Sequence, residues 1–586
     1  MNKQTDNKLE IIRHSTSHIM AYAVKELFGD KVKFAIGPTI DDGFYYDFDL
    51  GKDKTFSPDD LPRIENKMKE LIKKNLEFEK TELNIADAIK KVTGQTYKEE
   101  LIKDLEKIGE SKVSFYKIGE FEDLCRGPHV KSTKELGHFK LLKTSGAYWR
   151  GDEKNEMLQR IYGTAFATKD ELQTYLKMRE EAEKRDHRKL GAELELFMIS
   201  DEIGAGLPLF FPKGARLRHE IMNFALNTYL KNGYEMVITP HIASEKLFSH
   251  SGHLDFYSEG MYAPFGIDEE NYRLKPMNCP LQVQLYKAKS HSYRDLPIRW
   301  TEMGTVYRYE RSGTLHGLTR VRGFTQDDAH IICTPDQLEE EIKKALDLTL
   351  YMLKTFGFED FEMNLSVRNP EDKGHFIGDD KNWQMAEKIL KKVLEKSGFK
   401  NFVYDVGGAV FYGPKIDIKV SDAIGRKWQL STIQFDFNLP SRFEMFYIDE
   451  KNQKKEPFMI HRALLGSLER FLGVYIEHTA GAFPLWLSPV QTVIIPVSEK
   501  FNDYGEQVLT ELKSADIRAE IDASDESLGK RIRNAEKQKT PYILVVGEKE
   551  MTDKSVAVRK RNEGDLGAQK LAGFIDLIKK EVEEKK

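Results

Sequence analysis

The chain has 586 residues, with 90 Lys plus Arg against 95 Asp plus Glu, a formal net charge of −5. This length excludes a single small binding module and suggests about three or four domains. The near balance of charges excludes a basic nucleic-acid tail or an acidic solvating tail. No run approaches the ~18 consecutive apolar residues of a membrane span, and the start lacks the apolar stretch of a secretory signal, so we expect a soluble cytoplasmic protein. The 3 cysteines are too few for a disulfide framework and are expected to be free thiols.

The first block of the chain carries two pairs of histidines and cysteines with the same spacing. His14 and His18 lie four residues apart in a predicted helix, so they share one helix face. Cys125 and His129 repeat that spacing in the segment DLCRGPH. On the residues alone, these four side chains fit a zinc site with four ligands, and a catalytic or a purely structural role remains open.

A charged stretch follows and separates this block from the rest of the chain. From Lys169 to Leu190 the sequence lacks Gly and Pro and has too few apolar residues to bury a wide face, which predicts a solvent-bridging helix between domains. A second boundary falls near Pro484 and Pro489, just before the mostly apolar run from Val490 to Val497. That run predicts a buried strand that opens a new domain.

The middle and the last blocks predict different kinds of sheet. In the middle block a long helix is predicted over 215–233, with strands over 234–240, 299–310, 322–334 and 414–422. Strands joined by hairpin-like connections favour an antiparallel sheet flanked by helices. The last block alternates strands over 491–497, 518–522, 541–547 and 555–561 with helices over 501–515, 527–539 and 567–586. This order predicts a small α/β sandwich.

A predicted hairpin in the middle block collects arginines and carboxylates. Arg308 and Glu310 lie two apart, which places them on one face of a strand. The second strand is predicted to carry Arg320, Gln326 and Asp328. A charged antiparallel face with solvated ion pairs is the simpler interpretation of this pattern. A further arginine, Arg470 on a later predicted helix, would pair with a strand arginine as a clamp for a triphosphate, because guanidinium groups bind phosphate oxygens bidentately.

These segments resemble class II aminoacyl-tRNA synthetases. YRYE with GFTQDD is similar to the second motif of the class, LLGSLERF to the third, and the long helix leading to Pro240 to the first, which supports dimerisation in that class. KPMNCP, RVRGFTQDDAHI, YGPKIDI and MIHRALLGSLERF, with HSTSH and LCRGPH in the first block, resemble the threonyl-tRNA synthetase family over essentially the whole chain. Many members carry a further small domain before the editing domain, whereas this chain begins at the editing motif, as a bacterial type without that domain would.

The resemblance implies an α+β multidomain fold and a two-step activity. The implied domains are an α+β editing domain over 1–168, a linker helix over 169–189, a class II catalytic domain with an antiparallel sheet over 190–487, and an α/β anticodon-binding domain over 488–586. The implied reaction is ATP-dependent ligation of L-threonine to tRNA(Thr) through a threonyl-adenylate. A homodimer is implied as well.

The resemblance also implies one zinc ion per subunit, held by Cys279, His330 and His461. The spacing of these residues carries no local metal signature, so the residues alone predict only three buried structural positions. Three N/S ligands leave zinc with open positions, which threonine can fill through its amino nitrogen and its hydroxyl. Isosteric valine has no oxygen to offer, so binding would reject it.

For ATP, the resemblance places the α-phosphate at Arg308 and the γ-phosphate at Arg470, with Mg²⁺ as counter-ion. The other residues implied around ATP and the amino acid are Glu310, Arg320, Gln326, Asp328, Tyr412, Lys415, Gln429 and Gln434. No nucleophilic side chain is required, because positioning and positive charge do most of the work at a phosphoryl centre.

Serine offers the same amino and hydroxyl groups as threonine, so a second check is expected. The resemblance implies a metal-free pocket in the first block that hydrolyses mischarged seryl-tRNA. Its implied residues are His14, His18, Lys98, Asp123, Cys125 and His129. One zinc is therefore predicted within 190–586 and none within 1–168.

The last block is expected to bind the tRNA anticodon. The stretch 530–539 has five basic residues and one acidic residue, and a solvated basic helix explains it equally well. The resemblance implies that Glu550 and Arg559 read anticodon bases, since a carboxylate and a guanidinium complement base edges. Two alternatives remain open for the whole chain: a non-catalytic RNA-binding paralogue, and a zinc hydrolase in the first block with the rest as an RNA-holding body.

Overall fold

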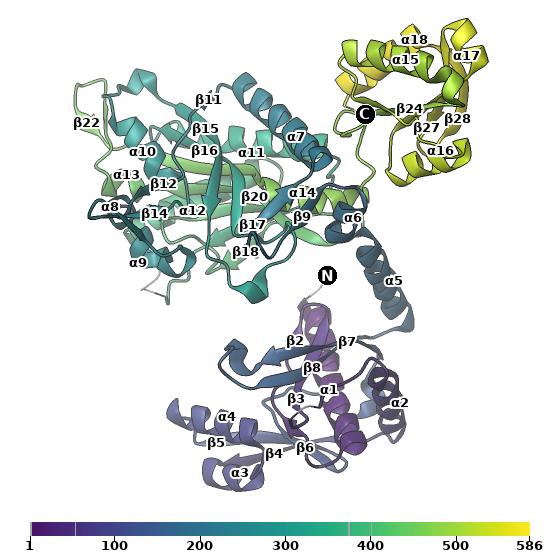
Figure 1. Ribbon diagram of the computed structural model, residues 1–586. Helices are drawn as coiled ribbons and strands as arrows, with labels where there is room; N and C mark the ends of the chain where they lie inside the picture. Colours follow the sequence, from purple (N-terminus) through teal and green to yellow (C-terminus); the bar gives the residue numbers. More distant parts are fainter. Residues whose placement is uncertain (1–2, 53, 373–375, 400, 586) are drawn as a thin grey trace. The chain divides into compact units, whose positions relative to one another are not determined.

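The computed structural model describes residues 3–52, 54–372, 376–399 and 401–585. The chain forms two compact units, Met1–Glu180 and Glu181–Lys586 (Figure 1). Each unit has its own buried core. The boundary between the units falls inside α5 (Lys169–Arg185). Among the helices in these described ranges, none has a stretch long and apolar enough to cross a membrane.

The first unit packs a long helix against an antiparallel sheet. Its elements are α1 (Lys3–Phe28), β1 (Lys33–Phe34), β2 (Thr39–Ile40), β3 (Gly43–Asp49), α2 (Asp60–Lys73), β4 (Phe78–Asn84), α3 (Ile85–Lys91), α4 (Thr96–Lys107), β5 (Lys112–Ile118), β6 (Phe121–Leu124), β7 (His138–Tyr148) and β8 (Met157–Phe166). The main sheet has the order β1-β3-β8-β7, with β2 beside β3, and a smaller sheet has the order β4-β5-β6. Phe44, Tyr46 and Phe48 alternate along β3 and are buried with apolar residues of α1, which fixes the helix on the sheet.

The charged linker helix ends earlier than predicted. α5 ends at Arg185, and a second helix, α6 (His187–Glu193), begins two residues later. Asp186 lies between them, and its carboxylate accepts a hydrogen bond from the Arg188 N–H. An aspartate of this kind satisfies a free N–H at a helix start, which favours a new helix over continuation of the old one. The prediction of one helix as far as Leu190 was wrong at this point.

The second unit is built on an eight-stranded sheet. Its elements before the C-terminal sheet are β9 (Phe197–Ile199), β10 (Pro208–Phe210), α7 (Pro212–Lys231), β11 (Glu235–Met236), β12 (Ile242–Ser244), α8 (Glu245–His250), α9 (His253–Tyr257), β13 (Phe265–Ile267), β14 (Glu270–Leu274), α10 (Cys279–Lys287), β15 (Ile298–Tyr307), β16 (Gly323–Cys333), α11 (Leu338–Thr355), β17 (Phe361–Val367), α12 (Asp380–Lys396), β18 (Val403–Val406), β19 (Lys415–Ser421), β20 (Lys427–Asp436), α13 (Leu439–Arg442), β21 (Tyr447–Ile448), β22 (Lys454–Lys455), β23 (Phe458–Ser467) and α14 (Leu468–Thr479). The strand order is β11-β15-β16-β23-β20-β19-β17-β18, antiparallel except at the two edge pairs. Helices α11, α12 and α14 pack on this sheet, so the predicted antiparallel sheet with flanking helices is confirmed.

The register of three central strands gathers polar side chains on one face. Gln326, Asp328 and His330 alternate along β16 and therefore point the same way. His330 lies opposite His461 of β23, and His461 lies opposite Gln434 of β20. Ala329 and Ile331 point to the opposite face of β16 and lie in the hydrophobic core under the helices.

The hairpin between β15 and β16 has a longer loop than predicted. β15 ends one residue before Arg308, and β16 begins after Arg322. Arg308, Glu310 and Arg320 therefore lie in the loop and not on strands, and the prediction was wrong in this respect. The Arg308 N–H still donates to Arg322 O (2.9 Å), but the Glu310 N–H turns back to Arg308 O (3.0 Å), which ends the strand pairing.

The C-terminal sheet forms the predicted α/β layer, with one strand and one short helix that were not predicted. Its elements are β24 (Thr492–Pro496), α15 (Asn502–Ser514), β25 (Ala519–Ile521), α16 (Leu528–Lys537), β26 (Tyr542–Val546), α17 (Glu548–Asp553), β27 (Ser555–Lys560), β28 (Gly564–Lys570) and α18 (Leu571–Glu583). The order is β25-β24-β26-β27-β28, parallel among the first three strands and antiparallel after them. β28 was predicted as the start of the last helix; Gly564 and Gly567, both at φ +80°, make it a hairpin strand instead.

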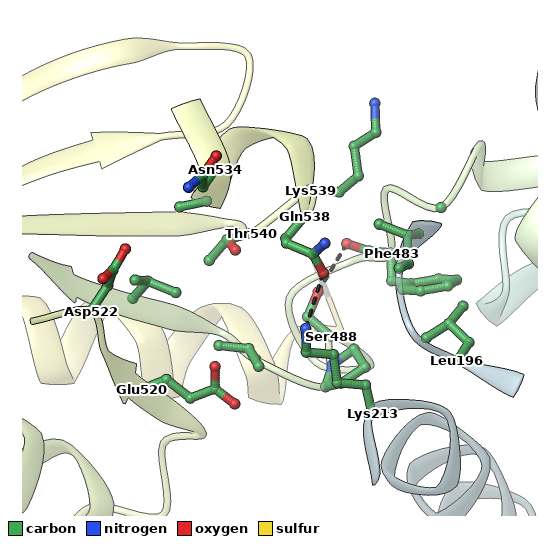
Figure 2. A pocket seen from close by; sticks show the side chains of 16 residues that line it. Leu196, Lys213, Phe483, Ser488, Glu520, Asp522, Asn534, Gln538, Lys539 and Thr540 are labelled. Carbon is green, nitrogen blue, oxygen red and sulfur yellow. Dashed lines mark hydrogen bonds between the residues drawn. The ribbon is translucent and has the colours of Figure 1, made fainter. Parts of the chain in front are cut away.

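Within the second unit, the C-terminal sheet and the N-terminal end of α7 border a cavity of about 240 Å³ (Figure 2). Lys213 Nζ donates a hydrogen bond to Gln538 Oε1 (3.0 Å), and Gln538 Nε2 donates to Glu193 O (3.0 Å). Leu196 and Phe483 form part of an apolar wall. The predicted site residues, all of which the structure describes, do not line this cavity.

Candidate functional site

A cavity of about 480 Å³ opens over the polar face of the eight-stranded sheet. The predicted residues that line it are Cys279, Arg308, Gln326, Asp328, His330, Tyr412, Lys415, Gln434 and His461. Glu310, Arg320, Gln429 and Arg470 lie outside this lining. The structure thus brings most of the residues predicted for ATP, the amino acid and the metal to one place.

Cys279, His330 and His461 form a compact set of metal-ligating side chains. All three are buried, and one ligand atom from each lies within 4.8 Å of the others. Nε2 of His330 is buried and has no hydrogen-bond partner among the described residues, which is costly unless a cation takes its lone pair. Nε2 of His461 bonds to Asp436 (2.8 Å), which leaves Nδ1 for a ligand. One sulfur and two imidazole nitrogens are a donor set that Zn²⁺ prefers, so these residues fit zinc.

The electrostatics of the set depend on burial. Burial raises the pKa of the Cys279 thiol well above its ordinary value and lowers the pKa of His330 well below its own. Both groups are therefore neutral without a cation nearby. Cys279 is the first residue of α10, and the positive end of a helix together with a metal ion favours the thiolate.

A buried chain of polar residues leads to His330. Gln282, one helical turn after Cys279, accepts a hydrogen bond at Oε1 from His330 Nδ1 (2.9 Å). Its Nε2 donates to Glu302 Oε2 (3.0 Å), and Glu302 pairs with Lys275 (3.4 Å). This series of hydrogen bonds fixes His330 as the tautomer that is protonated on Nδ1 and has a free lone pair on Nε2. Gln282, Glu302 and Lys275 were not predicted from the sequence, although the spacing of Gln282 from Cys279 on one helix face was a usable signal.

Asp328 is a buried acidic residue that lines the cavity. Burial raises its pKa to about 6, despite a hydrogen bond from Asn278 Nδ2 (3.0 Å). A carboxylate in this environment gains most from a cationic partner, such as the ammonium group of an amino acid.

Three arginines lie close together near the loop between β15 and β16. Arg308 Nε donates to Pro276 O (3.2 Å), and Arg470 Nε donates to Thr319 O (3.1 Å). Burial and then the charges of Arg320 and Arg308 lower the pKa of Arg470, with Glu310 opposing them. Like charges gathered in this way are stabilised by a polyanion.

The far side of the cavity holds two linked pairs. The Tyr412 hydroxyl donates to Gln434 Oε1, and both side chains line the cavity. Lys415 pairs with Asp417 (2.7 Å), and Gln429 donates to the other oxygen of Asp417 (2.8 Å). Gln429 is therefore connected to the site through Asp417 and does not line it.

A second cavity, of about 810 Å³, lies in the first unit. The predicted residues that line it are His14, His18, Lys98, Asp123 and Cys125. His129 lies beside them, with Nε2 at 3.3 Å from Cys125 Sγ and Nδ1 at 3.1 Å from Ser15 Oγ. His14 Nε2 also lies 3.3 Å from Cys125 Sγ. The structure thus gathers all six residues predicted for editing.

Asp123 is the centre of a buried ion pair in this cavity. Lys98 Nζ lies 2.5 Å from Asp123 Oδ1, and the Tyr46 hydroxyl donates to Asp123 Oδ2 (2.5 Å). Lys98 also bonds to Tyr46 (3.2 Å). Tyr46 was missed in the sequence, because an aromatic residue on an alternating strand looks like ordinary core.

The ligand atoms of His14, His18, Cys125 and His129 also lie within 4.8 Å of one another. Geometry alone therefore fits a metal here too. Burial raises the pKa of the Cys125 thiol to about 11, so without a metal it is a neutral S–H group and not a thiolate nucleophile. Burial also lowers the pKa of His129, so its ring is neutral and Nε2 can accept a hydrogen bond.

In the C-terminal sheet the two predicted anticodon residues lie on separate elements. Glu550 of α17 accepts the Gly547 N–H (3.0 Å) at the start of its own helix. Arg559 of β27 lines a cavity of about 330 Å³ and lies 3.7 Å from Asp565. Neighbouring Arg561 donates to Phe483 O (2.7 Å), so this basic residue is part of the packing within the second unit.

Known families match three parts of the chain. The tRNA synthetase class II core domain (G, H, P, S and T) matches residues 264–479, and the Anticodon binding domain matches residues 491–581. The Threonyl and Alanyl tRNA synthetase second additional domain matches residues 113–162, which include Asp123, Cys125 and His129. These matches agree with the predicted fold class, while the exact domain boundaries stay a prediction.

Relatives and solved structures agree with this result. Threonine--tRNA ligase of Sulfurihydrogenibium sp. (strain YO3AOP1) is 54% identical, with 100% of this chain and 90% of the relative covered, and that of Aquifex aeolicus (strain VF5) is 49% identical, with 98% and 90% covered. The RNA binding domain of threonyl-tRNA synthetase from Cryptosporidium parvum Iowa II is 40% identical with TM-score 0.65, over 67% of this chain and 98% of that chain. Prolyl-tRNA synthetase from Cryptosporidium parvum, with L-proline and AMP, is 17% identical with TM-score 0.51 over 68% of this chain and 74% of that chain, a likeness of fold alone. The resemblance found in the sequence is therefore confirmed, and the chain belongs to the threonine--tRNA ligase family of class II aminoacyl-tRNA synthetases.

Proposed function

We propose that the protein joins L-threonine to tRNA(Thr) through a threonyl-adenylate and hydrolyses mischarged seryl-tRNA(Thr) at a second site. The observation that carries the proposal is the cavity of about 480 Å³ that brings Arg308, the three metal-ligating residues and Asp328 together. A non-catalytic paralogue would have no need to keep all of these side chains around one cavity.

In the proposed first step, the threonine carboxylate attacks the α-phosphorus of ATP and pyrophosphate leaves. Arg308 holds the α-phosphate and Arg470 the γ-phosphate, with Mg²⁺ accompanying ATP. Zinc held by Cys279, His330 and His461 would supply open positions for the amino and hydroxyl groups of threonine. The tRNA 3′-terminal hydroxyl then attacks the carbonyl carbon, and AMP leaves.

The remaining predicted residues complete the pocket. Asp328 faces the ammonium group of threonine, and Glu310, held by Arg320 (2.8 Å), lies near the adenine. Tyr412, Gln434, Gln326, Lys415 and Gln429 border the amino acid and the phosphates directly or through Asp417. Transfer of labelled threonine to tRNA(Thr) in the presence of ATP and Mg²⁺ tests the proposal, and failure of a folded, zinc-loaded protein to charge this tRNA would contradict it.

For editing, we propose a metal-free pocket in which the histidines, Cys125 and the Asp123–Lys98 pair position a water and the seryl ester. The cavity of about 810 Å³ has room for an aminoacylated ribose. Nε2 of His14 and Nε2 of His129 both lie 3.3 Å from the sulfur of Cys125, which lines this cavity.

Replacement of His129 by alanine is expected to slow seryl-tRNA(Thr) hydrolysis by about 10²-fold, since it removes the ring that holds Cys125 in position and a misplacement of ~1 Å has an effect of this size. Threonine charging should be unchanged. His138→Ala, an exposed histidine in the same unit, is the matched control and should edit normally. Both variants should hold one zinc per chain; loss of zinc in His129→Ala alone would favour the alternative of a zinc hydrolase.

We also propose a cytoplasmic homodimer that reads the anticodon with Glu550 and Arg559. Support for the dimer comes from apolar side chains left open near the end of α7 and around β11: Ile238 is 85% exposed and Met236 is 52% exposed. Sedimentation at micromolar concentration should give a dimer, and Ile238→Asp should shift it to a 67.7-kDa species. A wild-type protein that sediments only as this single chain would contradict the dimer.

A further inference from the structure

A fully buried histidine, His187, lies between α14 and the loop that joins β15 to β16. It is the first residue of α6, and both its backbone N–H (3.1 Å) and its Nδ1 (2.6 Å) bond to Glu477 Oε1. On its other side, Nε2 accepts the backbone N–H of Leu318 (3.0 Å). Nε2 is therefore unprotonated, and Nδ1 carries the hydrogen that is donated to Glu477.

Glu477 is itself held in place. Arg426 bonds to its second oxygen, while His187 occupies the first. Burial raises the pKa of Glu477, but the hydrogen bonds from His187 and the charge of Arg426 more than offset this and leave its pKa below the ordinary value. The ring of His187 thus has an anionic, fixed partner on the helix side.

The loop is packed directly against this ring. A Cβ on Gly317, which has φ +48°, would lie 2.1 Å from His187 Nε2. A Cβ on Gly473 of α14 would lie 3.1 Å from Thr319 Cγ2 and 3.4 Å from His187 Cδ2. Only glycine leaves room for the ring and the loop to approach this closely.

The loop is tied to α14 at two points. Arg470 Nε donates to Thr319 O (3.1 Å), and one residue earlier Leu318 is joined through His187 to Glu477. Arg470 and Glu477 are seven residues apart on α14 and so share one helix face. The carbonyl of Thr319, which accepts the bond from Arg470, therefore follows directly after Leu318, whose N–H is bound by His187.

We infer that His187 is a positioning residue for ATP: its bond to Leu318 sets the place of Thr319 O and thereby aims Arg470 at the terminal phosphate. The inference rests on the proposed function of Arg470. His187 touches no substrate in this account and acts only through the loop.

Two variants separate the bonds of His187. Asparagine places an amide nitrogen near the position of Nδ1 and keeps the bond to Glu477, whereas glutamine places an amide oxygen near the position of Nε2 and keeps the bond to Leu318. His187→Asn is expected to raise the KM for ATP in threonine-dependent pyrophosphate exchange by about tenfold, because it leaves the Leu318 N–H unpaired. The KM for threonine should not change, and His187→Gln should restore the KM for ATP to within about twofold of wild type.

Thermal unfolding of both variants shows whether they lose similar stability. An ATP effect confined to His187→Asn supports the inference; equal ATP effects in both variants, or none in either, would overturn it. Calorimetric binding of a non-hydrolysable ATP analogue is measured in parallel. If the wild-type protein shows no exchange, the proposed function fails. The role of His187 is then tested by analogue binding alone. Weaker binding by His187→Asn but not by His187→Gln supports this role, and binding by His187→Asn equal to that of the wild-type protein overturns it.

Discussion

Replacement of Cys279 by alanine is expected to remove zinc from the protein and to lower threonine-dependent pyrophosphate exchange by about 10³-fold or more. Loss of the sulfur leaves two imidazoles, which hold zinc weakly. A metal centre that orients the substrate contributes several kcal/mol, and each ~1.4 kcal/mol is a factor of ten in rate. Metal content per chain and exchange rate are the two measurements.

Cys333→Ala is the matched control for this variant. Cys333 is also a buried free cysteine, and it ends the same strand, β16, that carries His330. Its loss should cost some stability through a small cavity but leave zinc and exchange in place. Full zinc content and normal exchange in Cys279→Ala would show that the assigned metal set is wrong.

The second large effect is expected at Glu302. Glu302→Gln leaves Lys275, which is 1% exposed, without its anionic partner, and should lower the free energy of unfolding by about 3–5 kcal/mol. The backbone N–H of Thr239 faces Oε1 (2.8 Å) and requires an oxygen there, so the new amide nitrogen must face Gln282. Gln282 then has to turn its own amide, which presents an N–H to His330 Nδ1 and places the ring proton on Nε2.

Zinc affinity of Glu302→Gln, measured by competition with a chelator, should therefore fall by about 10- to 100-fold. The double variant Lys275→Met/Glu302→Gln removes both charges and should regain most of the stability, because no uncompensated charge is left buried. In the double variant the Thr239 N–H still requires an oxygen at position 302, so the Gln282 amide stays reversed. Its zinc affinity should therefore stay low. Recovery of zinc affinity together with stability would mean that the chain of hydrogen bonds does not act on the metal site.

Local patterns predicted many of the elements but not where they end. The two sheets and the long helix α7 follow from periodic apolar residues and turn signals, which are local properties. The position at which α5 ends was not predicted, because Asp186 can lie inside a helix or cap the start of a new one. The strand β28 was not predicted, because it depends on two glycines that take positive φ. A local hydrogen bond in the first case, and two glycines with positive φ in the second, overrode neighbouring residues that favour a helix.

The candidate sites were predicted through family motifs, not through spacing. Cys279, His330 and His461 are brought together by strand register and by the position of α10, neither of which local sequence determines. The polar chain through Gln282 and Glu302, and the bond of His187 to the loop, were missed for the same reason. The role of a buried polar residue can be inferred only when its hydrogen-bond partners are known.

We propose that this protein activates threonine at a zinc-dependent site. Amino-acid-dependent exchange of pyrophosphate into ATP, measured with threonine, serine and valine, with added zinc and with a chelator, tests it most directly. The account predicts strong exchange with threonine, weaker exchange with serine, none with valine, and loss of exchange on chelation. Equal exchange with valine, or exchange that survives complete removal of zinc, would contradict the account.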